Sequence, residues 1–392
     1  MKRGAAITAA FAAGAVAGAA LILSLPVRGV LDIPGGPSLR QDVVVGEASV
    51  PTLLAWTPGR LPDGYAAAVR RVRSVRAATV VRSGVAWMDR WRDGSSPATR
   101  PPPGFRIPVE VASIHPASYG RFVPPAERAA VEGLDGVILG RTFAAHHGLG
   151  PGGEVTLGGT SVRVEAVVED ELVGAHEVVV PAERGLRLGI ARPRYLLVAP
   201  RDGASPEDVE RALRRLVPSG VRVRIRAPGE TPVFRHGDAV LPQVRVKELF
   251  GEFAAAPRSD GTVAVSPAWV RSNIRTAPVP ILGPIRCHRL ILPLVRAALE
   301  ELARRGVGHL IDRADYGGCY YPRFIASDPG TGLSHHSWGI ALDINVSQGL
   351  PGRQPTIDPR VVEAFEAQGF KWGGEFLIPD GTHFEFVRFP SP

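Results

Sequence analysis

The sequence has very few lysines and cysteines. Among its 392 residues only Lys2, Lys247 and Lys371 are lysine, and only Cys287 and Cys319 are cysteine. None of the three lysines stands in a P-loop or in a Ser-x-x-Lys motif, which excludes P-loop nucleotide hydrolysis and penicillin-type acylation. The motifs His-Glu-x-x-His and Gly-x-Ser-x-Gly are also missing, which excludes the helix-borne zinc protease and the α/β-hydrolase nucleophile.

The basic residues outnumber the acidic ones by 46 to 38, which gives a net charge of +8, and almost all of them are arginine. We interpret the arginines as scattered, as GC-rich codon usage would produce, and expect no nucleic-acid partner. The charge is compatible with attraction to an anionic cell envelope. With 45% hydrophobic and 21% charged residues, the chain buries cores, and its length corresponds to two or three domains of ~150 residues.

The first thirty residues have the pattern of a membrane segment. No charged side chain occurs between Gly4 and Val27, a length that crosses a bilayer core of ~30 Å as a helix. The residues after this stretch offer no clean cleavage site. We therefore predict that 1–30 is an uncleaved single-pass anchor with the bulk of the protein outside the cytoplasm; the alternative is a cleaved signal and a secreted protein.

The residues from 31 to 226 are expected to form a separate α+β extracytoplasmic module. Period-2 patterning around Gly158-Gly159 predicts a hairpin, Ser205-Pro206 predicts a helix start, and 221–225 alternates as a strand. The adjacent histidines 146–147 point apart on a helix, which favours a surface or packing role over metal binding. Residues ~130–170 resemble the extracytoplasmic domain of macrolide-exporter-type ABC permeases. The resemblance implies a binding or spacer module whose ligand or protein partner is unknown, without a transport role.

A proline-rich linker is predicted over 227–262, in which 244–253 is compatible with a short element.

The last part, 263–392, is predicted to be an α+β catalytic domain. An apolar stripe from Ile291 to Leu302 predicts a helix ended by Gly306, and 307–311 reads as a strand. Asp358-Pro359 predicts the start of a second helix, which Gly369 ends.

Two polar clusters of the last part carry the candidate chemistry. They are the segments 333–345, which contains His336 and Asp343, and 371–386, which contains Asp380 and His383. Two imidazoles and one carboxylate would leave zinc with a net positive charge and an open position, which is a catalytic arrangement. The spacing alone leaves two interpretations open, a metal site and ordinary polar strand ends.

The pattern Ser-x-His-x-x-Gly-x-Ala-x-Asp at 334–343, followed by Asp-x-x-His at 380–383, resembles a family of zinc peptidases that cut peptidoglycan stem peptides. This family contains VanY-type D-Ala-D-Ala carboxypeptidases and L-alanyl-D-glutamate endopeptidases. The blocks 317–323 and 372–374 are similar to its endopeptidase branch. The resemblance covers about 270–390. It implies a hedgehog-like domain with a small antiparallel sheet and flanking helices, and Zn²⁺ as cofactor.

Transferred residue by residue, the resemblance implies that His336, Asp343 and His383 are zinc ligands and that Asp380 is the general base. It also implies that Arg323 binds substrate or a developing oxyanion. The carboxypeptidase branch has a Glu where this chain has Asp380, so D-Ala-D-Ala specificity is not implied with the same force.

Several neighbouring side chains have more than one interpretation. Glu385 competes with Asp380 for the base, because it would share a strand face with His383. His335 is expected at the surface or behind a ligand. Ser334 and Trp372 are candidate substrate contacts, with a turn role and a packing role as their alternatives.

The two cysteines lie in the same predicted domain of an extracytoplasmic chain, a compartment where disulfides persist. We therefore predict a bridge between Cys287, which is expected to begin the helix after it, and Cys319. The alternatives are two buried free thiols and a reactive or metal-binding Cys319.

Together these features predict a membrane-anchored zinc metallopeptidase that hydrolyses peptide bonds in peptidoglycan stem peptides with a zinc-activated water. The alternative is a catalytically silent wall-binding or signalling protein that retains the peptidase fold.

Overall fold

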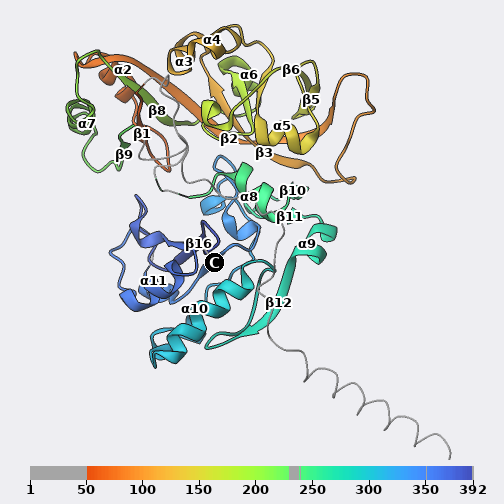
Figure 1. Ribbon diagram of the computed structural model, residues 1–392, viewed down its shortest axis with the longest axis vertical. Coiled ribbons are helices and arrows are strands. Elements are labelled where there is room, and N and C mark those ends of the chain that lie inside the picture. Colours follow the sequence, from red (N-terminus) through yellow and green to blue (C-terminus); the bar gives the residue numbers. More distant parts are fainter. Residues whose placement is uncertain (1–50, 229–237, 239, 350, 391–392) are drawn as a thin grey trace, which may run out of the picture. The chain divides into compact units, whose positions relative to one another are not determined.

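The computed structural model of the chain describes residues 51–228, 238, 240–349 and 351–390 (Figure 1). The segment predicted to be a membrane anchor or signal, residues 1–30, lies outside these ranges. No helix within the described ranges has the length and apolar character needed to cross a bilayer. The architecture is mixed α and β, as the sequence predicted.

Nine strands of the described region form one sheet in the order β3-β7-β4-β6-β5-β2-β8-β1-β9. β3 also pairs with β2, so the six strands from β3 to β2 close into a ring. The 18-residue strand β2 allows this, because one part of it pairs with β8 and the other with β3 and β5. The strands are β1 Leu53–Trp56, β2 Val75–Arg92, β3 Ile107–Ile114, β4 Val137–Gly140, β5 Glu154–Leu157, β6 Thr160–Val168, β7 Val178–Pro181, β8 Pro193–Pro200 and β9 Arg224–Arg226.

The local predictions for this region are confirmed in part. β5 and β6 form the predicted hairpin, and Ser205 caps α7 by accepting a hydrogen bond from the Asp208 amide. The strand predicted at 221–225 begins only at Arg224. His147 packs against Trp91 and Phe143, so the packing interpretation holds. The helices are α2 Tyr65–Arg70, α3 Pro116–Tyr119, α4 Pro125–Glu132, α5 Arg141–His147, α6 Ala182–Arg187 and α7 Pro206–Arg215.

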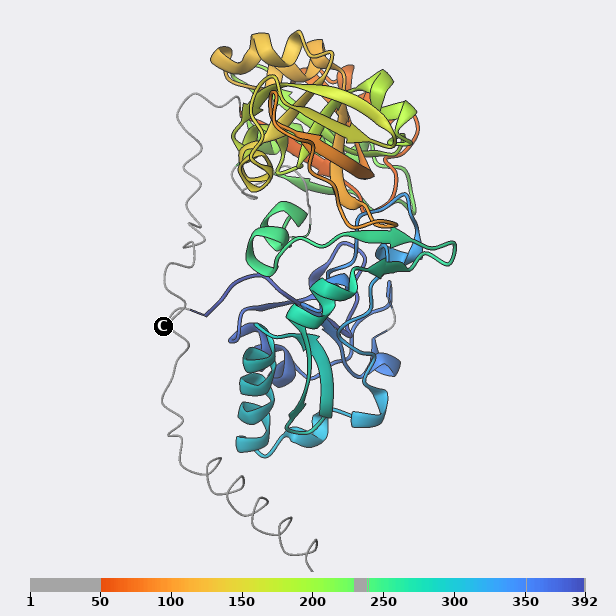
Figure 2. The same ribbon diagram turned by 90° about the vertical axis from the view of Figure 1, so that its right-hand side faces the viewer.

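The last part of the chain combines small antiparallel sheets with one longer helix, α10, and several short ones. Helix α10 runs along the β12–β13 hairpin in both views (Figures 1 and 2). The strands β14, β15 and β16 form a three-stranded sheet with β16 in the middle. The elements are α8 Gln243–Phe250, β10 Ala255–Pro257, β11 Val263–Val265, α9 Pro267–Asn273, β12 Ile274–Val279, β13 Gly283–His288, α10 Leu292–Arg304, β14 Ala341–Asp343, α11 Pro359–Glu366, β15 Phe370–Trp372 and β16 His383–Phe386.

The predicted helix over 291–302 is confirmed as α10, whose apolar stripe is fully buried. The strand predicted over 307–311 is wrong, because this segment contains a single 3₁₀ turn, Gly308–Leu310. Asn345 supplies the hydrogen bonds that a strand partner would have supplied. Its side chain donates to the Leu310 carbonyl and accepts from the Asp312 amide, at 2.7 and 2.8 Å.

The predicted disulfide between Cys287 and Cys319 is present, with the two Cα atoms 5.4 Å apart. The placement of Cys287 at a helix start is wrong, because Cys287 lies in strand β13 opposite Arg275. The helix begins later, at Leu292, where Pro293 fits the first turn because that position needs no amide donor. The bridge therefore joins a strand, rather than a helix, to the loop before Arg323.

His288 is a buried imidazole held in its neutral form. Its Nε2 lies 3.2 Å from the Phe250 carbonyl, and its Nδ1 accepts from the Leu290 amide. Burial lowers the pKa of His288 to about 4. Below pH 6.5 His288 is therefore protonated in the unfolded chain but stays neutral in the folded chain. The free energy of unfolding falls as the pH drops towards 4.

We expect His288 alone to remove roughly 2 kcal/mol of the free energy of unfolding between pH 7 and pH 5. His288→Gln should reduce the pH dependence of urea unfolding by that amount, because the glutamine amide does not titrate. His309→Gln at an exposed position is the control and should keep the wild-type dependence. An unchanged pH dependence in His288→Gln would contradict the assignment.

Candidate metal centre

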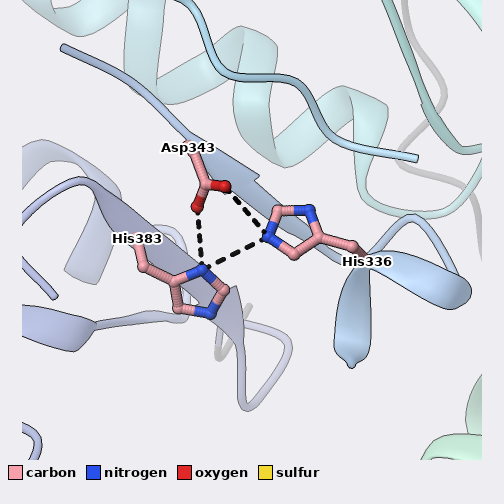
Figure 3. Close-up of side chains that lie close together, drawn as sticks. All are labelled: His336, Asp343 and His383. Atoms are coloured by element: carbon pink, nitrogen blue, oxygen red, sulfur yellow. Dashed lines mark hydrogen bonds and ion pairs between the residues drawn. The ribbon is translucent and has the colours of Figure 1, made fainter. Parts of the chain in front are cut away.

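The three predicted ligands, His336, Asp343 and His383, meet at one point of the small sheet (Figure 3). Asp343 at the end of β14 lies directly opposite His383 at the start of β16, which explains how residues forty positions apart become neighbours. His336 comes from the 3₁₀ turn His335–Ser337. His383 Nδ1 lies 2.9 Å from Asp343 Oδ1, and His336 Nε2 lies 3.3 Å from both Asp343 Oδ2 and His383 Nδ1.

The outer nitrogen of each imidazole has its own partner. His336 Nδ1 lies 2.9 Å from the Cys319 carbonyl oxygen, and His383 Nε2 lies 3.3 Å from Glu385 Oε2. Since these partners are acceptors, they fix the proton on the outer nitrogen and leave His336 Nε2 and His383 Nδ1 free to coordinate. Metal-binding histidines in proteins are usually held in this way.

The charges in the site are strongly coupled. Burial alone would lower the pKa of His383, but hydrogen bonds to Asp343 and Glu385 raise it to about 10. Burial alone would likewise raise the pKa of Asp343, yet His336 and His383 hold it well below its usual range. Without a metal the site therefore keeps a proton between these side chains, and a cation that binds there must displace it.

The donor set fits zinc. Each of the three residues offers one ligand atom, all lie within 4.8 Å of one another, and the set contains one carboxylate and two imidazoles. Across the described residues this is the one such cluster of three or more His, Cys, Asp or Glu side chains. Three ligands from protein leave a coordination position for water or substrate, as catalytic zinc sites do.

The glycines of the block 317–318 allow the chain to approach Asp343 closely. The Gly317 amide donates to the Asp343 carbonyl at 2.9 Å, and the Asp343 amide donates to the Gly318 carbonyl at 3.0 Å. A Cβ atom on Gly317 would lie 2.8 Å from the Asp343 Cβ, which is too close. The two glycines therefore align the backbone of a candidate ligand.

Asp380 lies in the loop before β16, and the block 372–374 shapes this loop. The Asp380 amide donates to the Gly373 carbonyl at 2.9 Å, and the Trp372 indole donates to the Gly381 carbonyl at 2.8 Å. A Cβ on Gly373 would lie 2.7 Å from the Asp380 carbonyl oxygen. Thr382 Oγ1 donates to Asp380 Oδ1, which leaves Oδ2 for other partners. The Trp372 indole thus serves to hold the loop.

Arg323 and Ser334 lie in adjacent segments beside His336. Ser334 Oγ accepts a hydrogen bond from the His336 amide and caps its turn, which is the local role that the sequence left open. The Arg323 guanidinium lies over the Tyr321 ring, 5.7 Å from its centre. Within the described ranges no carboxylate forms an ion pair with it. Its charge is therefore available to an anionic ligand.

Of two further neighbours of the site, His335 takes the position behind a ligand that the sequence offered as one alternative, and Tyr316 had no predicted role. His335 does not point to solvent: its Nδ1 lies 2.8 Å from Glu385 Oε2, and both side chains are largely buried. Tyr316 has a buried hydroxyl without a hydrogen-bond partner among the described residues, and burial together with the charge of Asp343 raises its pKa. Neither contact has a local signal, because each depends on loops that meet only in the folded chain.

Comparison with known families identifies two parts of the chain. Residues 5–216 match the family of MacB-like periplasmic core domains. The chain belongs to this family. The match is much longer than the forty residues on which the sequence resemblance was based. No curated protein matches the chain.

Solved structures similar to this chain include two extracytoplasmic regions and one permease domain. The periplasmic region of MacB from Actinobacillus actinomycetemcomitans is 15% identical, with 42% of this chain and 81% of that chain covered and a TM-score of 0.30. A domain of a putative permease from Porphyromonas gingivalis is 14% identical, with 46% and 88% covered and a TM-score of 0.28. The extracellular domain of the noncanonic ABC-type transporter YknZ from Gram-positive bacteria is 15% identical, with 45% and 98% covered and a TM-score of 0.29.

The second match of the chain covers residues 327–386 and is to a peptidase family described as D-alanyl-D-alanine carboxypeptidase. His336, Asp343, Asp380 and His383 all lie inside this match. The chain thus combines a MacB-like periplasmic core domain with a peptidase-family segment that holds the three clustered candidate ligands. Both resemblances seen in the sequence are confirmed.

Proposed function

We propose that the chain is an extracytoplasmic zinc peptidase that hydrolyses peptide bonds in peptidoglycan stem peptides. The observation that carries this proposal is the cluster of His336, Asp343 and His383, whose ligand atoms converge while both outer imidazole nitrogens are held by acceptors. The disulfide and the periplasmic family of residues 5–216 support a location outside the cytoplasm.

A bound zinc ion would supply Lewis acidity towards water and towards the amide carbonyl. The chain's own residues supply the rest. Asp380, through its free Oδ2, would take the proton of the attacking water and pass it to the leaving amine. Arg323, which has no carboxylate partner within the described ranges, would bind a carboxylate of the stem peptide. Asp343 would neutralise part of the charge of the cation, because the two coordinating imidazoles are neutral.

Glu385 is a poorer base than Asp380 because its carboxylate is buried and already shared by two imidazoles. His335 and His383 lie 2.8 and 3.3 Å from Glu385 Oε2. Burial by itself would raise the pKa of Glu385, but His335 and His383 hold it well below its usual range. We infer that Glu385 orients His383 rather than accepting a proton from water.

The test of the proposed function is turnover of purified muropeptides by the full chain, with products identified by mass spectrometry. Hydrolysis that requires zinc would support a peptidase, and the product masses would identify the scissile bond. Zinc-loaded, folded protein that binds muropeptides without hydrolysing them would favour the silent wall-binding alternative.

The full chain should bind close to one zinc per molecule, and His336→Ala should reduce this to almost none, because two remaining ligands hold zinc poorly. His309→Ala removes an exposed imidazole elsewhere and should leave the stoichiometry unchanged. Elemental analysis after gel filtration measures both. Folded wild-type protein that stays free of zinc after loading would refute the site.

Glu385→Gln should weaken zinc binding by a factor of about 10 to 100, because the amide no longer holds the His383 proton as a carboxylate does. Competition with a chromogenic chelator measures the affinity. Glu363→Gln on the exposed side of α11 is the control. A variant that keeps wild-type zinc affinity and loses turnover would instead make Glu385 the base.

A further inference from the structure

The MacB-like domain has a cavity of about 440 Å³ in which every charged lining residue is arginine. Arg70 ends helix α2, Arg76 lies near the start of β2, and Arg121 belongs to the 3₁₀ turn Gly120–Phe122. Neither Asp nor Glu is found among the residues that line it in the described structure. Three arginines therefore line the cavity, and no residue with a carboxylate side chain is among its described lining.

The sequence concentrates positive charge at this place. The segment 70–76 contains four arginines in seven residues, so the expectation that the arginines are scattered is wrong here. Arg121 joins them from a distant part of the chain, because α3 packs against β2 through a 2.7 Å hydrogen bond between Thr79 Oγ1 and Ser118 Oγ. Like charges gathered in one concave surface create a positive potential that attracts anions.

Little of this charge is neutralised by the protein. Arg76 Nη1 lies 3.5 Å from Asp202 Oδ1, and both side chains are exposed. Arg70 and Arg121 form no ion pair with any described residue. Arg70 Nε donates to the Ala78 carbonyl at 3.1 Å, which orients the guanidinium and leaves its two terminal nitrogens free. Two of the three groups are thus uncompensated, and one of them is already held in place.

We propose that this cavity binds the phosphate group of an anionic envelope component, as a phosphomonoester or phosphodiester. Guanidinium groups bind phosphate oxygens through paired N–H donors, and three of them match the several oxygens of one phosphate. The volume lies in the range of about 300–1,000 Å³ that small-ligand sites occupy. The Ser118 hydroxyl is not counted among the hydrogen-bond donors to the phosphate, because it already donates to the His115 carbonyl.

The phosphate can belong to a lipid headgroup or to a soluble wall component, and the experiment separates the two. The full chain in uncharged detergent micelles is titrated with inorganic phosphate and with glycerol 1-phosphate by calorimetry at constant ionic strength. In a second arm, the shift in melting temperature is compared between micelles that contain phosphatidylglycerol and micelles that contain phosphatidylcholine. Binding in the first arm indicates that the phosphate group suffices, and binding only in the second indicates a lipid headgroup.

The variant Arg70→Gln/Arg76→Gln/Arg121→Gln should weaken binding at least tenfold in whichever arm shows it. The control Arg100→Gln/Arg163→Gln/Arg215→Gln removes the same charge from exposed positions outside the cavity and should change binding less than twofold. Equal weakening in both variants would show a general charge effect and overturn the site, as would wild-type protein that binds in neither arm. Circular dichroism of each variant confirms that it is folded.

Discussion

Asp380→Asn should lower the rate of muropeptide hydrolysis by a factor of 10² or more while leaving zinc in place. The amide cannot accept the proton of the attacking water, and loss of a general base commonly has an effect of this size. Zinc should stay because the three clustered ligand atoms come from other residues. Steady-state kinetics together with elemental analysis of the same preparation measures both quantities.

The informative contrast is between Asp380→Asn and Asp380→Glu. The longer carboxylate can still accept a proton, so Asp380→Glu should recover part of the lost rate, which a merely structural role of Asp380 would not predict. Full activity in Asp380→Asn would contradict the assignment and transfer the base role to Glu385. A parallel loss of zinc in Asp380→Asn would instead show that the loop supports the metal ligands.

Lys247→Met should lower the free energy of unfolding by about 3–5 kcal/mol, the usual effect of leaving buried charges without their partner. Lys247 on α8 is 4% exposed. Its Nζ lies 2.6 Å from Glu177 Oε1 and 2.8 Å from Glu252 Oε1, and donates to the Pro108 carbonyl. Burial favours the neutral amine, but the two carboxylates raise the pKa of Lys247, so it stays charged.

Urea unfolding of the full chain measures this loss, and Lys371→Met is the control. Lys371 pairs with Glu375 at the surface, where an ion pair contributes about 0–1 kcal/mol. Adding Glu177→Gln and Glu252→Gln to Lys247→Met should restore part of the stability, because the buried negative charges are then gone. Equal stability of Lys247→Met and Lys371→Met would contradict this prediction, because it would mean that water reaches Glu177 and Glu252.

The cluster of candidate metal ligands was the most predictable part of the structure, because its residues stand in a spaced pattern that a family shares. The pattern could not specify how the site is held. The Cys319 carbonyl that holds His336, and the Glu385–His335 pair behind His383, depend on loops and strands that meet through tertiary packing. The sequence therefore could not show that Glu385 contacts both His335 and His383, which is the observation that favours Asp380 as the proposed base.

The other predictions divide in the same way: features set by local sequence were predictable, and contacts made through tertiary packing were not. The hairpin of β5 and β6 and the start of α7 depend on local turn and cap chemistry, and both were predictable. The segment 307–311 has strand-like residues, but Asn345, more than thirty positions away, satisfies its backbone. The cluster around Lys247 likewise joins 108, 177 and 252, so no window of sequence could reveal it.

The disulfide makes the geometry of the candidate metal site depend on the redox conditions around the protein. The Cys319 carbonyl that orients His336 belongs to a half-cystine, and its partner Cys287 is anchored in β13. In a reducing compartment the loop alone positions the Cys319 carbonyl. In an oxidising compartment the disulfide ties this loop covalently to strand β13. Oxidation of the two cysteines and fixing of the candidate ligand geometry are thereby one event, because the same bridge that closes the loop also holds the carbonyl against His336.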